Sequence, residues 1–353
     1  MKLVDGIAAF IRTSLQKFDD DVETGEEEEA LFLSYIKRMA AFSGFLDLRH
    51  WDLWDMLLKV VSNYDKEDSQ RDVRERCMQM LFMQLCFDVV ALRKDGETPK
   101  AEQVRKVKKR RDQLIRILSE VLSEEASGVE QAYLSVCDLM TIFGCQIAID
   151  CKAMEPLIWR PDEYVIGNLK VYLKVNVFEV ENLEEMANQQ ERIVMMHKMR
   201  QLVAQYAKLV IHGSLPISDA CELMRRYQSH FSDFGDIFKN LLSKCREIDF
   251  VDTGLMIVET LKILYQEMEQ SRQTDPVSEA FNSIRDLAKR LAPAFGGDYR
   301  KNRYAVTSLH KKTIDFAFEG FQKENSSEPP NIYFLEIAIE FSNKLLAQDK
   351  LAV

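Results

Sequence analysis

The sequence predicts an all-α fold, and three observations support that prediction. Apolar residues recur at intervals of three and four along most of the chain, as in residues 136–147, so one side of each helix would be buried. Proline and glycine are scarce, at 8 and 13 of 353 residues, so few turns interrupt the helices. The alternating pattern of strands is nearly absent, and its one candidate, residues 168–178, also fits a helix.

The helices follow one another with short links. The periodicity predicts them at residues 3–18, 30–43, 51–63, 70–92, 99–122, 127–150, 162–178, 183–212, 216–230, 234–246, 250–270, 276–292, 300–319 and 331–347. Prolines support several ends, because Pro99, Pro216 and Pro276 stand where helices begin and Pro293 stands where one ends.

Neighbouring helices form pairs of roughly 40–47 residues, which is the repeat length of HEAT-type arrays. In such arrays each pair buries its apolar side only against its neighbours. We therefore expect a HEAT-like α-solenoid of about 14 helices in antiparallel pairs. A compact helical bundle is the alternative.

Composition limits the classes of protein that the chain can belong to. A net charge of −10 and a pI near 5.2 argue against indiscriminate binding of nucleic acid or membrane, so any such binding would be local. The seven cysteines form no CxxC pair, which favours a reduced intracellular setting. No apolar run reaches the ~18 residues of a transmembrane helix. We expect a soluble protein that does not enter a membrane.

We expect one continuous helical-repeat segment over residues 1–353 with two acidic loops. Residues 18–29 hold eight carboxylates and residues 179–186 hold four, which is typical of solvated linkers. The first loop lacks the glycine that a calcium-binding loop has at its sixth position. The sequence therefore predicts no metal site in these loops.

Motifs that carry catalysis are missing from the sequence. It contains no GxxxxGK[ST] phosphate loop, GxGxxG dinucleotide motif, HExxH zinc motif or GxSxG nucleophile motif. The five histidines have no metal-ligand spacing with one another or with the cysteines. We therefore expect no enzymatic activity, no cofactor and no small-molecule substrate.

Positive charge gathers on one segment of this acidic chain. Residues 93–116 hold ten lysines and arginines against four acids, which leaves +6. Apolar residues from Val104 to Leu118 form a buried stripe, so the charges should fan across the exposed side of a helix. Such a side binds DNA phosphates without reading sequence, and the alternatives are a solvated helix or a nuclear-import signal. The predicted DNA-binding residues here are Lys100, Arg105, Lys106, Lys108, Lys109, Arg110 and Arg111.

A second basic cluster spans residues 289–312. Its seven lysines and arginines face one acid, Asp298, and again leave +6. The predicted DNA-binding residues are Arg300, Lys301 and Arg303. Acidic groups of a protein partner, or solvent, are equally suitable partners for this cluster.

Five stretches of the chain, taken in order, resemble one protein family. They are AFSGFLDLRHWDLW (41–54), MEPLIWRPD (154–162), FSDFGDIFKNLLSKCREID (231–249), SLHKKTIDFAF (308–318) and FSNKLLAQDK (341–350). Together they resemble the stromal antigen family, the Scc-three-type subunits of cohesin. The resemblance falls on the carboxy-terminal half of that family's helical-repeat body.

The resemblance implies a non-catalytic adaptor. Stromalins bind the kleisin subunit of cohesin, contact double-stranded DNA without sequence preference, and dock cohesin loading and protection factors. This implies a nuclear, chromosome-associated role in sister-chromatid cohesion and chromosome segregation, in mitosis or meiosis. The alternative is another HEAT-repeat scaffold, such as a transport receptor or a phosphatase regulatory subunit.

The resemblance also implies a kleisin-binding site at residues 159–162. In the family, the aspartate of the Pro-Asp motif belongs to the kleisin-binding surface, and this is Asp162 here. From the residues alone, Asp162 should cap the helix that starts beside it, and Trp159 is either a core residue or an exposed anchor. The predicted kleisin-binding residues are Asp162, Trp159 and Arg160.

Overall fold

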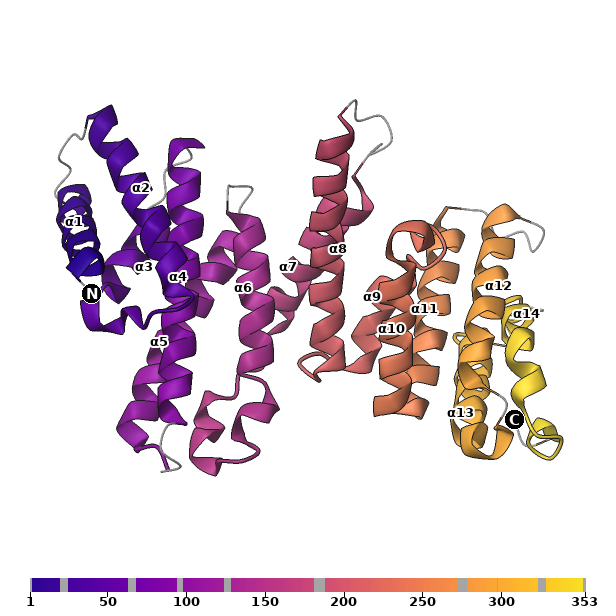
Figure 1. Cartoon of the computed structure of the whole chain (residues 1–353). Helices are drawn as coiled ribbons and strands as arrows, with labels where there is room; N and C mark the ends of the chain where they lie inside the picture. The colour runs from indigo at the N-terminus through magenta and orange to yellow at the C-terminus, as the bar shows by residue number, and fades with distance from the viewer. Residues whose placement is uncertain are drawn as a thin grey trace. The chain divides into compact units, whose positions relative to one another are not determined.

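The computed structural model describes residues 2–19, 25–62, 68–93, 98–123, 128–180, 188–271, 278–296, 298–322 and 328–351. All regular structure in these ranges is helical, which confirms the predicted all-α fold (Figure 1). The chain divides into two compact units, Met1–Val175 (unit 1) and Asn176–Val353 (unit 2). The continuity expected over residues 1–353 stays a prediction.

Unit 1 is built from seven α-helices in the described ranges. They are α1 (Lys2–Asp19), α2 (Glu26–Ser43), α3 (Trp54–Ser62), α4 (Asp68–Leu92), α5 (Ala101–Leu122), α6 (Val129–Ile142) and α7 (Glu163–Leu173). Helices α2 and α3 pack against α4, and α5 packs against both α4 and α6. Leu81, Leu114 and Leu139 are fully buried where these helices meet. Each such side chain stabilises the fold by about 1.5–3 kcal/mol.

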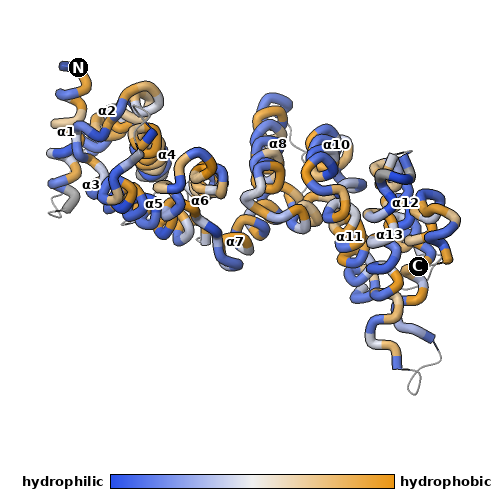
Figure 2. Tube along the Cα trace, turned by 90° about the horizontal axis from the view of Figure 1, so that it is seen from below, coloured by the Kyte–Doolittle hydropathy of each residue, from blue (hydrophilic) through white to orange (hydrophobic). Residues whose placement is uncertain are grey.

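Unit 2 contains the remaining labelled α-helices. They are α8 (Gln189–Ile211), α9 (Cys221–Met224), α10 (Phe231–Ile248), α11 (Phe250–Gln270), α12 (Glu279–Leu291), α13 (Tyr299–Ala317) and α14 (Phe334–Ala338). Helix α11 packs closely against α13, since a Cβ at Gly254 would lie 3.4 Å from the carbonyl oxygen of Ala305. Hydrophobic and hydrophilic residues recur in turn along most helices (Figure 2). This pattern is expected of helices that bury one side.

The candidate strand at residues 168–178 is helical. Helix α7 continues into a π-helical turn, Lys174–Phe178. Of the apolar residues that alternate there, Leu169, Leu173 and Val177 are buried at helical spacing, while Val171 and Val175 are exposed.

Several predicted helices are shorter than expected. The helix predicted at 51–63 begins at Trp54, because Asp52 has a left-handed backbone with φ of 47°. The helix predicted at 127–150 ends at Ile142 and is followed by two 3₁₀ turns, Cys145–Ala148 and Lys152–Leu157, the second of which contains Pro156. Helix α6 ends there because Gly144 has an extended backbone, with φ of −68° and ψ of 178°, which leaves the helical conformation.

Two further helices are also shorter than the periodicity predicts. The region 216–230 holds a 3₁₀ turn, Ile217–Ala220, and only four α-helical residues in α9. The region 331–347 holds the short α14 and a 3₁₀ segment, Ile339–Lys344. In both regions the apolar pattern is right and the residues are buried, but the turns are tighter than those of an α-helix.

The acidic loops are only partly within the described residues. Residues 20–24 and 181–187 lie outside them. The prediction of a loop at 18–29 is wrong at both ends, since α1 runs to Asp19 and Glu26–Glu29 form the first turn of α2. Carboxylates at that position are favoured by the positive end of the helix dipole.

Candidate nucleic-acid interface and partner-binding segment

Helix α5 positions the first basic cluster. It starts after Lys100, whose backbone is extended and whose N–H donates to the side-chain oxygen of Gln103 at 3.0 Å. That bond satisfies one of the amide groups left free at a helix start. The predicted buried stripe is confirmed, since each of its residues is at most 9% exposed: Val104, Val107, Leu114, Ile115 and Leu118. The opposite side of α5 therefore faces solvent.

Five basic side chains project from that exposed side, and we call them the basic face: Arg105, Lys106, Lys108, Lys109 and Arg116. Lys108 pairs with Asp112 at 3.2 Å, and Arg116 lies 3.8 Å from Glu120. Arg105, Lys106 and Lys109 form no ion pair within the described part of the chain. Lys100 is also exposed, just before the helix.

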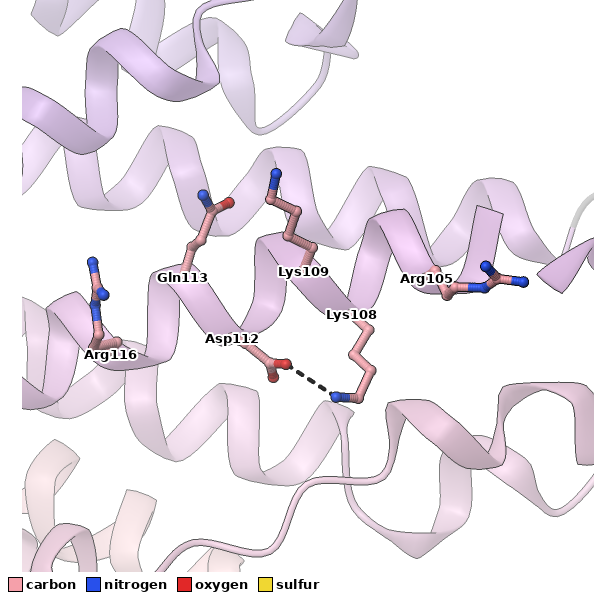
Figure 3. A pocket seen from close by; sticks show the side chains of 6 residues that line it. All are labelled: Arg105, Lys108, Lys109, Asp112, Gln113 and Arg116. Atoms are coloured by element: carbon pink, nitrogen blue, oxygen red, sulfur yellow. Dashed lines mark hydrogen bonds and ion pairs between the residues drawn. The ribbon is translucent and has the colours of Figure 1, made fainter. Parts of the chain in front are cut away.

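Four members of the basic face line a shallow depression that is open to solvent. Asp112 and Gln113 complete the lining with Arg105, Lys108, Lys109 and Arg116 (Figure 3). In this view Lys109, Gln113 and Arg116 project to one edge of α5, while Lys108 reaches toward Asp112. One carboxylate among four cations leaves the depression positively charged, so it can receive an anion.

The structure corrects the expectation that Arg110 belongs to the exposed side. Its guanidinium pairs with Asp88 of α4 at 2.8 Å, and its side chain is only 12% exposed. It also stacks over the ring of Trp54 at 4.9 Å from the centroid. Cation–π stacking and the ion pair hold Arg110 against the protein.

Arg111 is likewise not on the exposed side, being only 4% exposed. Its guanidinium donates to the carbonyl of Leu157 and, from Nε at 2.9 Å, to Asp112. It lies over the ring of Phe143 at 5.6 Å. Arg111 therefore ties α5 to the segment that precedes α7, and the sequence analysis missed this structural role.

The second basic cluster, at 289–312, is partly neutralised. Arg303 makes a two-pronged pair with Asp349, at 2.8 Å from Nε and 2.6 Å from Nη2. Asp349 is buried, and its contact holds the pKa of Arg303 above its usual value. Lys289 pairs with Asp286 at 3.0 Å. Arg300 is exposed, and the side chain of Lys301 lies outside the described residues.

The segment before α7 carries the predicted kleisin-binding residues. Asp162 caps α7, since its carboxylate accepts a hydrogen bond from the N–H of Val165 at 2.9 Å. The predicted capping role is thus confirmed. Trp159 is half-buried, and its backbone N–H donates to the carbonyl of Phe143 at 2.8 Å. Arg160 is exposed, so the segment presents a carboxylate and a guanidinium to solvent beside an aromatic ring.

Two buried cysteines have weakly acidic thiols. Burial raises the pKa of the Cys77 thiol to about 12 and that of Cys245 to about 11, so these thiols stay protonated and unreactive at neutral pH. Within the described ranges no three His, Cys, Asp or Glu side chains cluster to hold a metal ion. No helix there is both long and apolar enough to cross a membrane.

Comparisons with known proteins identify the family. Residues 1–87 match the family described as "Cohesin subunit SCC3/SA, HEAT-repeats domain", and residues 250–353 match "STAG protein C-terminal domain". The chain is 72% identical over 340 residues to cohesin subunit scc-3 of Caenorhabditis elegans, covering 96% of this chain and 31% of that protein. The chain belongs to the SCC3/SA family of cohesin subunits.

Other members of the family are more distant. The chain is 28% identical to cohesin subunit SA-1 of Xenopus laevis, over all of this chain and 29% of that protein. It is 29% identical to cohesin subunit SA-3 of Rattus norvegicus, over 95% of this chain and 27% of that protein. The chain thus spans less than a third of the length of these relatives.

The two family matches cover the two ends of the chain and not residues 88–249. The match at residues 1–87 names HEAT repeats and agrees with the predicted HEAT-like solenoid. Helices α5 and α7 lie between the two matched ranges, whereas α13 lies inside the STAG C-terminal match. The basic face and the Asp162 segment therefore lie outside both matched ranges of this SCC3/SA family member.

Proposed function

We propose that the chain is a non-catalytic adaptor segment of cohesin that binds the kleisin subunit and double-stranded DNA. Membership in the SCC3/SA family supports a place in cohesin, on chromosomes in the nucleus, with a role in sister-chromatid cohesion. It also makes cohesin loading and protection factors reasonable partners. The alternative of a transport receptor or phosphatase scaffold finds no support among the family's members.

The basic face of α5 is the single observation that carries the DNA-binding proposal. Arg105, Lys109 and Arg116 fall at spacings of four and seven residues, so they form one row along the helix. At 1.5 Å per residue the row extends about 16 Å, which is the length of about five base pairs along the axis of a duplex. A row of exposed cations of this length can release several counterions from a duplex at once.

The basic face favours the backbone of a duplex over unpaired bases. Binding of single strands relies on exposed aromatic rings on which bases stack. The ring of Trp54, which Arg110 covers, is only 2% exposed. We therefore expect binding through phosphates, without sequence preference.

The Asp162 segment supports the kleisin-binding proposal. The carboxylate of Asp162 uses one oxygen to cap α7 and remains exposed, so it can accept a further hydrogen bond from a partner. Trp159 beside it offers a half-buried ring of the kind that anchors protein interfaces. Arg160 can pair with an acidic group of the same partner.

The DNA proposal is tested with a variant of the basic face. Substituting Arg105, Lys106 and Lys109 with glutamate should weaken duplex binding equally on unrelated sequences. It should also flatten the dependence of log K on log salt by about 2.7, since each lost phosphate contact removes about 0.9. The fold should persist, because exposed substitutions change stability by only about 0.5 kcal/mol each. Fluorescence anisotropy across a salt series measures both effects.

A matched control places the same charge change on unit 2. Arg300, Lys311 and Lys312 are exposed on α13, and reversing all three should flatten the salt dependence much less. An unchanged affinity and slope in the α5 variant would show that the basic face is only solvated. In that outcome a loss of binding in the α13 variant would move the interface to unit 2.

A further inference from the structure

Asp88 lies at the centre of a cluster of four charged side chains beneath the basic face. It belongs to α4 and is 7% exposed. Its Oδ1 accepts from Nη1 of Arg49 at 3.1 Å, and its Oδ2 accepts from Nη1 of Arg110 at 2.8 Å. Arg49 in turn donates from Nε to Asp47 at 2.7 Å. Two carboxylates and two guanidinium groups therefore neutralise one another.

The cluster is tight enough to perturb the groups in it. Hydrogen bonding to Arg49 lowers the pKa of Asp47, and the two carboxylates raise the pKa of Arg49. Both oxygens of Asp88 are occupied, one by each arginine. Withdrawing Arg110 would leave the buried Asp88 carboxylate with half of its partners, which is unfavourable in a site of low exposure.

Arg110 is otherwise well placed to join the basic face. It follows Lys109 directly and lies one helical turn after Lys106, both of which are exposed. Its other contact is with Trp54, whose Nε1 donates to Gln113 at 3.3 Å on the rim of the depression. The Asp88 pair and the Trp54 ring thus hold a cation at the edge of the surface without exposing it.

We propose that Asp88 withholds Arg110 from DNA and so sets how many phosphates the basic face neutralises. This inference rests on the proposed DNA-binding function. The orientation of α5 is fixed independently by its buried apolar stripe, so removing the Asp88 charge frees the Arg110 side chain without turning the helix. A freed Arg110 adds one phosphate contact, which makes duplex binding tighter and more sensitive to salt.

The experiment measures the salt dependence of duplex binding in four variants of the whole chain. Asp88→Asn should steepen the slope of log K against log salt by up to about 0.9. Arg110→Gln should leave the slope at its wild-type value, because Arg110 does not touch DNA. The double variant should also return to the wild-type slope. Lys109→Gln, which removes a member of the basic face, should flatten the slope by about 0.9.

A charge-matched control and a DNA-independent readout complete the design. Asp55→Asn removes an exposed carboxylate from α3 without freeing an arginine, so it should change the slope little. Modification by p-hydroxyphenylglyoxal, read by mass spectrometry, should be slow at Arg110 in the wild type and fast in Asp88→Asn. The exposed Arg105 should react rapidly in both proteins.

The outcomes separate this inference from the proposed function. Flattening by Arg110→Gln as large as that by Lys109→Gln would overturn it, because Arg110 would then contact DNA directly. So would equal slow modification of Arg110 in the wild type and Asp88→Asn. If Asp88→Asn does not fold, comparing the salt slopes of Arg110→Gln and Lys109→Gln still tests whether Arg110 contacts DNA. No effect of Lys109→Gln, or no duplex binding by the wild type, would overturn the proposed function itself and this inference with it.

Discussion

Helix α5 of unit 1 and helix α13 of unit 2 carry the two basic clusters of the chain, each with a net charge of +6 over its stretch of sequence. On α5, five cations remain on the exposed side, and three of them have no ion pair among the described residues. On α13, Arg303 is bound to the buried Asp349, and nearby Lys289 of α12 pairs with Asp286. Arg300, Lys311 and Lys312 of α13 are exposed and also lack an ion pair among the described residues, so each helix keeps three such cations. The two helices differ in spacing, because the three on α5 fall within five residues, whereas Arg300 lies eleven residues before Lys311.

The comparison teaches that each helix uses an arginine to hold a later segment of the chain. Arg111 of α5 donates to Leu157, 46 residues on, and Arg303 of α13 pairs with Asp349, also 46 residues on. A planar guanidinium with five donors suits this role better than a lysine ammonium. Lysines, by contrast, make up most of the basic face of α5. The residue type thus helps to separate structural from surface charge.

The largest expected effect separates the two kinds of arginine within α5. Arg111→Ala removes a buried guanidinium and leaves the Leu157 carbonyl without this donor. It should lower the free energy of unfolding by about 2–3 kcal/mol. Arg105→Ala should change it by about 0.5 kcal/mol or less. All three tryptophans, at 51, 54 and 159, lie in unit 1, so the midpoint of urea unfolding by tryptophan fluorescence reports this unit. Equal midpoints for the two variants would contradict the assignment.

The sequence contained a signal for the buried position of Arg111 that charge counting overlooked. Residues 104, 107, 111, 114 and 118 follow the three-and-four spacing of the buried stripe, so Arg111 occupies an apolar position. No such signal marked Arg110. Its position depends on Asp88, which lies 22 residues earlier on another helix, and periodicity within α5 does not report that contact.

The fold was more predictable than the surfaces. Helix α5 was expected at 99–122 and spans Ala101–Leu122, because a strong apolar period and Pro99 mark it. The Asp162 cap was also predicted, since a carboxylate before a helix start has a local role. The 3₁₀ turns after α6 were missed, because Cys145–Ala148 and Lys152–Leu157 bury residues at a spacing that resembles an α-helix. Which basic side chains are exposed depends instead on partners distant in sequence, such as Asp88 for Arg110.

A second, smaller effect tests whether unit 1 has a partner surface that α13 lacks. Asp162→Ser keeps a good N-cap and removes the charge, whereas Asp162→Ala removes both. We expect Asp162→Ala to lower stability by about 1 kcal/mol and Asp162→Ser to lower it much less. Both should weaken binding of a kleisin central fragment about tenfold, or about 1.4 kcal/mol, measured by isothermal titration calorimetry.

Arg300→Ala on α13 is the control for that experiment and should leave kleisin affinity unchanged. Wild-type affinity for Asp162→Ser would show that the Asp162 carboxylate serves α7 only as a cap. An equal loss in Arg300→Ala would instead place the kleisin contact, at least in part, on unit 2.

The smallest expected effect is a difference in pH response between the two units. His310 of α13 is 7% exposed, and burial together with the nearby Lys350 lowers its pKa, against a hydrogen bond with the Phe341 backbone. Burial also lowers the pKa of His230 in the same unit. The unfolded chain protonates histidine below about pH 6.5, while the folded chain keeps these rings neutral. The unfolded state therefore binds more protons, and unit 2 loses stability as pH falls from 6.5 toward the lowered pKa values.

Hydrogen exchange followed by mass spectrometry reads this effect helix by helix in the whole chain. Exchange of the α13 amides should quicken between about pH 7.5 and about pH 5.5, after correction for the intrinsic rate, because the titration of histidine lies in that window. His310→Asn keeps an N–H group near the Phe341 carbonyl but does not titrate, so it should reduce the pH dependence of α13. Its effect on the amides of α5 should be negligible, since His310 belongs to unit 2. The same pH dependence of α13 in His310→Asn and wild type would rule out this ring as its source and leave His230 as the remaining candidate.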